Sequence, residues 1–141
     1  MDAEEAPLVI LLAEDSSEDE FLVRHQLKRA GFSGIIHRVR DGQEAISYLN
    51  GKQGFEDREA FPLPDLIVTD LKMPRLDGFQ LIRWLKQRAE LARLPVLVLS
   101  SSNLEADLQK ARELGVCAYL TKDILMGDGT RLLQELQTAF K

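Results

Sequence analysis

The stretch LIVTD, residues 66–70, is an apolar run of strand length that ends in the carboxylate of Asp70. A second apolar run ends in the same way at Glu14 and Asp15, and a third, shorter run is followed by Lys122. In an open α/β sheet, ligands bind in the crevice beyond the carboxyl ends of the strands. Charged residues at the ends of three runs therefore predict a functional site at one edge of a sheet.

Short β-rich runs alternate along the chain with segments of helical periodicity, a pattern typical of βαβ units and a parallel sheet. Of the five runs, the one at residues 35–39 is the most polar, which places it at a sheet edge. Residues 52–64 are charged and longer than a usual αβ loop, so we expect an extended helix tail or a surface excursion there. The pattern predicts an α/β domain with five strands, at residues 8–13, 35–39, 66–69, 96–99 and 118–121.

Polar residues predict where several helices begin. Ser17 with Glu20 forms a capping-box pattern ahead of the first helix, and Ser102 with Glu105 repeats it ahead of the fourth. Asp41 precedes the second helix and is expected to cap it. These signals give each of these predicted helices a defined start.

Composition limits the classes of function. The 141 residues predict an N-terminal arm at residues 1–7 and a single domain over residues 8–141. A net charge of −5 and a pI near 5.1 argue against direct binding of nucleic acid. The acidic start and the lack of an apolar stretch of roughly 18 residues argue against export and membrane insertion, so we expect a cytoplasmic protein. Cys117 is the single cysteine and is expected to be buried and without chemistry of its own.

The acidic residues at the predicted strand ends favour a metal ion. Glu14, Asp15 and Asp70 repel one another unless a cation or a shared proton compensates their charge. Mg²⁺ takes oxygen ligands and keeps several waters, which leaves positions open for phosphate oxygens. Zinc is disfavoured because His25 and His37 lie on the first helix and the second strand rather than at ligand spacing.

A carboxylate such as Asp70 can also act as a nucleophile and form an acyl phosphate, provided that the charge on the transferring phosphoryl group is neutralised. Mg²⁺ and Lys122 would supply that positive charge, and the hydroxyl of Ser100 could donate to a phosphoryl oxygen. Taken alone, each residue has an ordinary explanation, because an aspartate after a strand often caps a turn and Ser100 could simply precede a helix.

The chain resembles a response-regulator receiver domain from about Leu8 to Phe140. The resemblance implies a flavodoxin-like, doubly wound (βα)5 fold with strand order 2-1-3-4-5. It is carried by LLAED at residues 11–15, DLKMP at 70–74 with DG at 77–78, Ser100 at the end of PVLVLS, and Lys122 shortly after Tyr119.

The resemblance implies roles for the residues around the metal. Asp70 would be the phosphoacceptor, so the protein would show at most Mg²⁺-dependent self-phosphorylation and dephosphorylation rather than act as an enzyme. Glu14 and Asp15 would hold Mg²⁺, or Mn²⁺ in its place, together with Asp70 and the backbone carbonyl of Lys72. The side chain of Lys72 would either flank the path of the attacking water or be a solvated loop residue.

The resemblance also implies a switch. Ser100 and Lys122 would contact the phosphoryl group, and Tyr119 would turn inward as Ser100 moves on activation. The fourth helix, fifth strand and fifth helix would form the output surface. Leu125 and Met126 would add apolar contacts near it or belong to the core.

The chain departs from the family pattern at Asp123, where a proline normally follows the lysine and the peptide bond is usually cis. A cis bond before a non-proline residue costs about 2.5–4 kcal/mol, so we expect a trans Lys122-Asp123 bond with the lysine re-aimed. The added carboxylate could also weaken phosphorylation or shorten the lifetime of the phosphorylated form.

Partners follow from the resemblance. A sensor histidine kinase or a phosphotransfer protein would donate the phosphoryl group, and the output would be contact with a downstream protein or with a second copy in a homodimer. Residues 52–64 and the lack of an output domain make the chain similar to stand-alone receivers found beside phytochrome kinases. A phytochrome-type kinase is therefore a candidate donor.

Other classes fit less well. Phosphotransferases of the haloacid-dehalogenase type need a second aspartate two residues after the nucleophile, where this chain has Lys72. A flavodoxin-like cofactor binder would need a phosphate-cradling loop after the first strand, but residues 14–18 read EDSSE and would repel phosphate. A receiver-fold module that works without phosphorylation remains open because of Asp123.

Overall fold

The computed structural model describes residues 7–140, so most of the predicted arm at residues 1–7 lies outside the described residues. One parallel sheet has five strands in the order β2-β1-β3-β4-β5. The strands are β1 (Val9–Ala13), β2 (Ile35–Val39), β3 (Leu66–Thr69), β4 (Val96–Ser100) and β5 (Ala118–Thr121). The predicted fold class, strand order and edge position of the second strand are confirmed.

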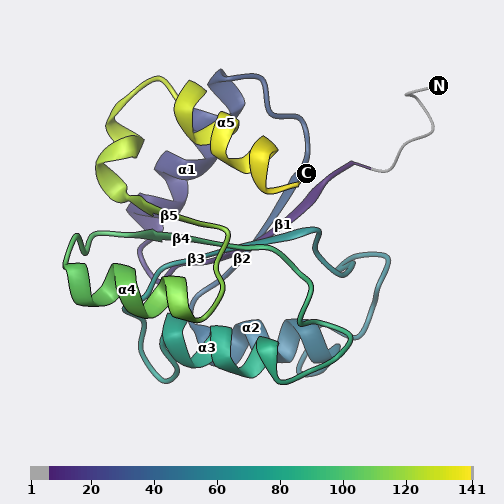
Figure 1. Ribbon diagram of the computed structural model, residues 1–141. Coiled ribbons are helices and arrows are strands. Elements are labelled where there is room, and N and C mark those ends of the chain that lie inside the picture. Colours follow the sequence, from purple (N-terminus) through teal and green to yellow (C-terminus); the bar gives the residue numbers. More distant parts are fainter. Residues whose placement is uncertain (1–6, 141) are drawn as a thin grey trace.

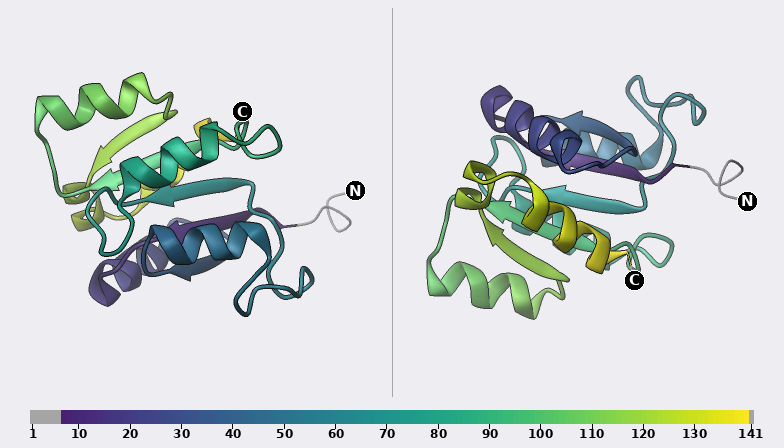
Figure 2. Two further views of the ribbon diagram at one scale, coloured as in Figure 1. Left: turned by 90° about the horizontal axis from the view of Figure 1, so that it is seen from below. Right: turned by 90° about the horizontal axis from the view of Figure 1, so that it is seen from above.

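Helices cover both faces of the sheet. Figure 1 shows α1 and α5 on one face and α2, α3 and α4 on the other, and Figure 2 shows the same layers from below and above. The helices are α1 (Ser17–Arg29), α2 (Gly42–Asn50), α3 (Gly78–Lys86), α4 (Glu105–Glu113) and α5 (Thr130–Ala139), with a 3₁₀ helix η2 (Lys122–Met126) between β5 and α5.

Burial explains why the apolar runs form strands. Every residue of β1, β3 and β4 is buried, as expected for central strands of a parallel sheet covered on both faces. Side chains alternate between two apolar cores, so Leu11 packs toward α2 and α3 while Leu12 packs toward α1 and α5. The sheet is therefore a rigid platform that fixes the positions of its strand ends.

Two of the predicted helix caps differ in detail from the structure. The cap of α1 is Ser16 rather than Ser17, because Ser16 has the extended backbone that lets its Oγ accept from Asp19 N at 3.1 Å. The predicted Ser102-Glu105 capping box is wrong, since α4 begins after Leu104 with no side-chain cap. The expectation for Asp41 is confirmed by the capping bond that its Oδ1 accepts at 2.8 Å.

Residues 52–64 form a surface excursion and not a helix tail. Helix α2 ends at Asn50, and Gly51 takes the left-handed conformation that stops it, with φ of 67°. The guanidinium of Arg58 then donates to the carbonyl oxygens of Tyr48, Leu49 and Phe61 at 2.8–3.0 Å. This arginine ties the excursion to the last turn of α2.

The structure also tests the expectations for Cys117, for Leu125 and Met126, and for membrane-spanning helices. The expected burial of Cys117 is wrong: the residue is exposed, because it lies just before β5, where its thiol donates to Val96 O at 3.2 Å. Leu125 is a core residue, whereas Met126 is 79% exposed. Within residues 7–140 no helix is both long and apolar enough to cross a membrane.

Candidate functional site

The register of the sheet brings the predicted site residues to one edge. Ala13 pairs with Thr69, so the residues that follow them leave β1 and β3 side by side, and Asp70 N donates to Ala13 O at 3.0 Å. Ser100 pairs with Thr121 in the same way at the ends of β4 and β5. The sheet therefore delivers carboxylates, a hydroxyl and an ammonium group to one edge, as the sequence predicted.

The carboxylates of Glu14, Asp15 and Asp70 gather into one cluster. Each offers an oxygen, and these oxygens all lie within 4.8 Å of one another. Within residues 7–140 this is the one group of histidine, cysteine and acidic side chains that could hold a metal ion. Burial raises the pKa of Glu14, and the hydrogen bond from Lys122 partly offsets that rise. An all-oxygen donor set suits a hard divalent cation.

Lys122 supplies the positive charge of the site. Its Nζ lies 2.9 Å from Glu14 Oε1, 2.6 Å from Asp19 Oδ2 and 2.8 Å from Asp70 Oδ2. Burial of the ammonium group lowers its pKa, but the hydrogen bonds from Lys122 to these carboxylates outweigh burial and raise the pKa above its ordinary value. Lys122 therefore stays protonated at neutral pH and balances part of the acidic cluster.

The structure corrects one expectation about Lys122. No peptide bond within residues 7–140 is cis, so the predicted trans Lys122-Asp123 bond is confirmed. The predicted re-aiming of the lysine is wrong, because the side chain still reaches Asp70. The carboxylate of Asp123 instead accepts a hydrogen bond from the hydroxyl of Thr121, at the exposed start of η2.

Asp70 is held by its neighbours in the chain and by a close approach of α3. Its Oδ1 accepts from Leu71 N at 2.7 Å, while Oδ2 faces Lys122. A side chain at Gly78 would place its Cβ 2.2 Å from Asp70 O, so only glycine lets α3 begin this close to the end of β3. These contacts fix the predicted phosphoacceptor within the acidic cluster.

Ser100 and Tyr119, the predicted switch residues, meet at the loop between β4 and α4. Ser100 is buried, and its Oγ accepts from Ser102 N at 3.1 Å. The hydroxyl of Tyr119 donates to Ser102 O at 2.8 Å. One loop residue, Ser102, therefore connects the two side chains through its N–H and its carbonyl group.

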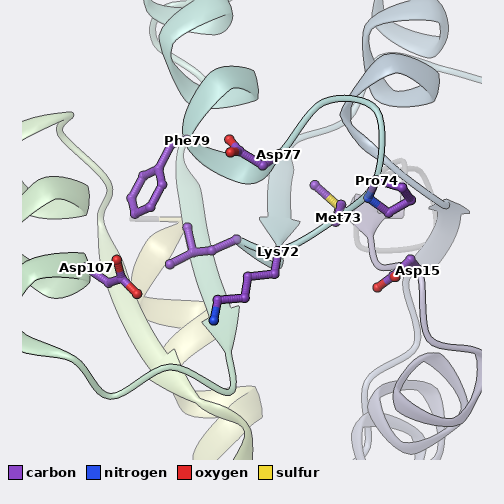
Figure 3. Close-up of a pocket in the computed structure, with 8 residues that line it drawn as sticks. Asp15, Lys72, Met73, Pro74, Asp77, Phe79 and Asp107 are labelled. Carbon is purple, nitrogen blue, oxygen red and sulfur yellow. The ribbon is translucent and has the colours of Figure 1, made fainter.

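A groove runs along the loop after β3, beside the acidic cluster. Figure 3 shows Asp15 on one side of it, Phe79 and Asp107 on the other, and Lys72 between them. The side chain of Lys72 is exposed, which agrees with either role considered for it from the sequence. Lys72 also lines a second depression together with Asp70 and Ser100.

Sequence reasoning missed Asp19 as part of the site. Asp19 lies in the first turn of α1, and the distance from its Oδ2 to Lys122 Nζ is the shortest of the three Lys122 ion pairs. The available signal was its position, because a helix that starts directly after a strand places its first turn above the strand end. Acidic residues are also common in first helical turns, which masked this signal.

The fold and the site together define a class of protein. A receiver-family model, described as the response regulator receiver domain, matches residues 10–138, and the chain belongs to this family. Its relatives are response regulators of two-component signal transduction, and this chain is a receiver domain of that class.

Three relatives show how similar the chain is to individual members. Response regulator Rcp1 of Synechocystis sp. is 36% identical over 137 residues, which cover 97% of this chain and 91% of Rcp1. The solved Mn²⁺-bound form of Rcp1 superposes with a TM-score of 0.80 over 94% of this chain and 93% of that structure. Response regulator RPA3017 in red light signaling of R. palustris has a TM-score of 0.83 at 32% identity, covering 92% and 90%.

The third relative is the phosphorylated cyanobacterial phytochrome response regulator RcpA. It has a TM-score of 0.75 at 32% identity, and the match covers 96% of this chain and 90% of RcpA. The chain is thus similar to phytochrome-associated response regulators, in agreement with the resemblance found in the sequence. The acidic cluster also agrees with divalent metal binding of the kind seen in the Mn²⁺-bound form of Rcp1.

Proposed function

We propose that Asp70 accepts a phosphoryl group from a phosphohistidine of a sensor histidine kinase or a phosphotransfer protein. A carboxylate oxygen of Asp70 would form the new bond to phosphorus as the bond from phosphorus to the imidazole nitrogen breaks. The observation that carries this proposal is the contact of Asp70 with Lys122 inside a cluster of carboxylates at the strand ends.

Each remaining residue has a part in this transfer. Glu14, Asp15 and Asp70, with the backbone carbonyl of Lys72, would hold Mg²⁺, which supplies positive charge to the phosphoryl oxygens when bound. Lys122 would move from carboxylate oxygens to a phosphoryl oxygen, a shift that needs no change in its protonation. Ser100 would donate its hydroxyl to another phosphoryl oxygen.

The output follows from the loop between β4 and α4. When Ser100 turns to the phosphoryl group, its bond from Ser102 N is lost, and Tyr119 can follow the loop inward. The surface of α4, β5 and α5 would then change its affinity for a downstream protein or for a second copy. We place this activity in the cytoplasm, without direct contact with nucleic acid, and we regard a phytochrome-type kinase as the donor.

Intact-protein mass after incubation with Mg²⁺ and acetyl phosphate tests the proposal. One added phosphoryl group is expected on the native chain and on Asp57→Asn, an exposed control in the excursion, and none on Asp70→Asn. An adduct that persists in Asp70→Asn would refute the assignment of the acceptor. No adduct on any chain, with Mg²⁺ binding intact, would favour a module that works without phosphorylation.

A further inference from the structure

Lys122 stands at the start of a segment that has little regular structure and is attached to the core through Leu125. Residues 122–129 contain two glycines and no proline, and the regular structure in them is η2, a 3₁₀ helix of five residues. The hydrogen-bond geometry of 3₁₀ helices is poor, and glycine adds backbone freedom. Burial of Leu125 fixes the middle of this segment, but the backbone at its glycine-rich end depends on contacts with other elements of the fold.

Gln26 provides such contacts from α1. The residue is 6% exposed, and its Nε2 donates to Leu125 O at 2.8 Å and to Gly127 O at 2.5 Å. These carbonyls lie at the end of η2, where a helix leaves its last carbonyl groups without internal partners. One amide nitrogen thus binds two carbonyl groups, one within η2 and one directly after it.

The orientation of this amide is set by its partners. Both contacted atoms are carbonyl oxygens, which only accept hydrogen bonds, so the atom between them must be the nitrogen of Gln26. That orientation leaves Oε1 buried with no partner within the described residues. One unpaired acceptor is the smaller cost, because an apolar side chain at this position would leave the carbonyl oxygens of both Leu125 and Gly127 without a donor.

Helix α1 contacts the segment at further points. Asp19 binds the Lys122 ammonium group, and Gln26 follows Asp19 by seven residues, which places both on one face of the helix. A side chain at Gly129 would put its Cβ 2.1 Å from Gln26 O, so the backbones of α1 and of the start of α5 are nearly in contact. The same helix thus holds the ammonium group at one point and the backbone behind it at another.

We infer that Gln26 is a positioning residue for phosphoryl transfer, which fixes the backbone of η2 so that Lys122 reaches the phosphoryl site. The inference rests on the proposed function of Asp70 for its catalytic consequence. Its structural part, the control of Lys122 by Gln26, does not depend on phosphorylation. The two parts can therefore be tested separately.

Amine labelling of Lys122 tests the structural part. Gln26→Met keeps the length of the side chain and removes both donors, while Gln137→Met makes the same change at an exposed position of α5. With a limiting amine-reactive reagent and peptide mass spectrometry, we expect Lys122 labelling in Gln26→Met to rise several-fold, because the ammonium group would leave its contacts with the three carboxylates more often and become accessible. Labelling equal to that of the native chain, in a variant with native circular dichroism, would overturn the inference.

Phosphorylation by acetyl phosphate tests the catalytic part. The initial rate should fall by about tenfold in Gln26→Met, equivalent to about 1.4 kcal/mol at the transition state, and stay unchanged in Gln137→Met. If the native chain takes up no phosphoryl group, the proposed function fails, while the labelling result still decides the role of Gln26. Increased labelling with an unchanged rate would overturn the catalytic role.

A milder variant covers the case in which Gln26→Met does not fold. Gln26→Asn keeps a buried amide but withdraws its nitrogen by one methylene, out of reach of both carbonyls. The same rise in Lys122 labelling is expected. Native labelling in a folded Gln26→Asn protein would overturn the inference in the same way.

Discussion

Replacing Lys122 with methionine should destabilise the protein, and a divalent cation should recover much of the loss. Methionine keeps an apolar stem but leaves the carboxylates of Glu14 and Asp70, whose side chains are 2% and 9% exposed, without their cation. Breaking a buried ion pair costs about 3–5 kcal/mol. The side chain of Lys122 is 13% exposed and that of Asp19 is 28% exposed, so solvent weakens these ion pairs. We therefore expect a loss of unfolding free energy at the lower end of this range, about 3 kcal/mol. For a chain of this size the melting temperature should fall by about 6–12 °C.

The effect of Mg²⁺ distinguishes this account from a simple packing defect. Mg²⁺ at about 100 times its Kd stabilises a native state by about 2.7 kcal/mol. The variant should bind Mg²⁺ more tightly than the native chain, because Lys122 no longer competes for the same oxygens. The difference in melting temperature between the variant and the native chain should therefore narrow when Mg²⁺ is added at constant ionic strength.

Scanning calorimetry with and without Mg²⁺ makes the measurement, with Lys52→Met as a control for loss of an exposed lysine in the excursion. The control should show little change in either condition. The reasoning would be refuted by a difference for Lys122→Met that is the same in both conditions, or by no difference without Mg²⁺.

Three further predictions concern a helix cap, a histidine and Asp123. Asp77→Ala removes the capping box with Gln80 at the start of α3 and should lower the unfolding free energy in urea by about 1 kcal/mol. Burial, followed by the charge of Arg24, lowers the pKa of His37. The unfolded chain therefore binds the proton first, so the contribution of His37 to stability is complete above about pH 6.5 and is lost as the pH falls through the lower pKa of the folded state. In urea titrations at several pH values, His37→Gln should show a smaller loss of stability as the pH falls. An unchanged pH dependence of stability in this variant would contradict the role given to His37. Asp123→Pro removes a carboxylate beside Lys122 and should raise the phosphorylated fraction in intact-mass spectra. An equal fraction in the variant and the native chain would contradict this expectation.

The strand ends can be predicted because they depend on local sequence. An apolar run followed by a charged residue marks where a buried strand meets solvent, and this pattern alone is enough to place Glu14, Asp15 and Asp70 at one edge of the sheet. Asp41 likewise caps α2 through a bond to the third residue after it in the chain. Features that reside in a few neighbouring residues can be read directly from the sequence.

Features that depend on distant residues could not be predicted in the same way. Lys122 pairs with Asp19 across 103 positions, and nothing near either residue indicates this contact. The identity of Asp123 alone predicts a re-aimed Lys122, but α1 supports η2 through Gln26 and keeps the lysine in place. The capping box at Ser102 fails because its hydroxyl oxygen accepts from Leu104 N rather than from Glu105 N, while the hydroxyl donates to Asp107, and α4 starts at Glu105.

The anchoring of the excursion by Arg58 affects how the protein opens. An irregular segment of this length would ordinarily fluctuate locally and be cut by proteases first. Here the guanidinium holds three carbonyl groups, and the rings of Phe55 and Phe61 pack against Tyr48, which is fully buried. The amides around Phe61 should therefore exchange with deuterium only when α2 also opens, and limited proteolysis should spare the excursion until the whole domain unfolds.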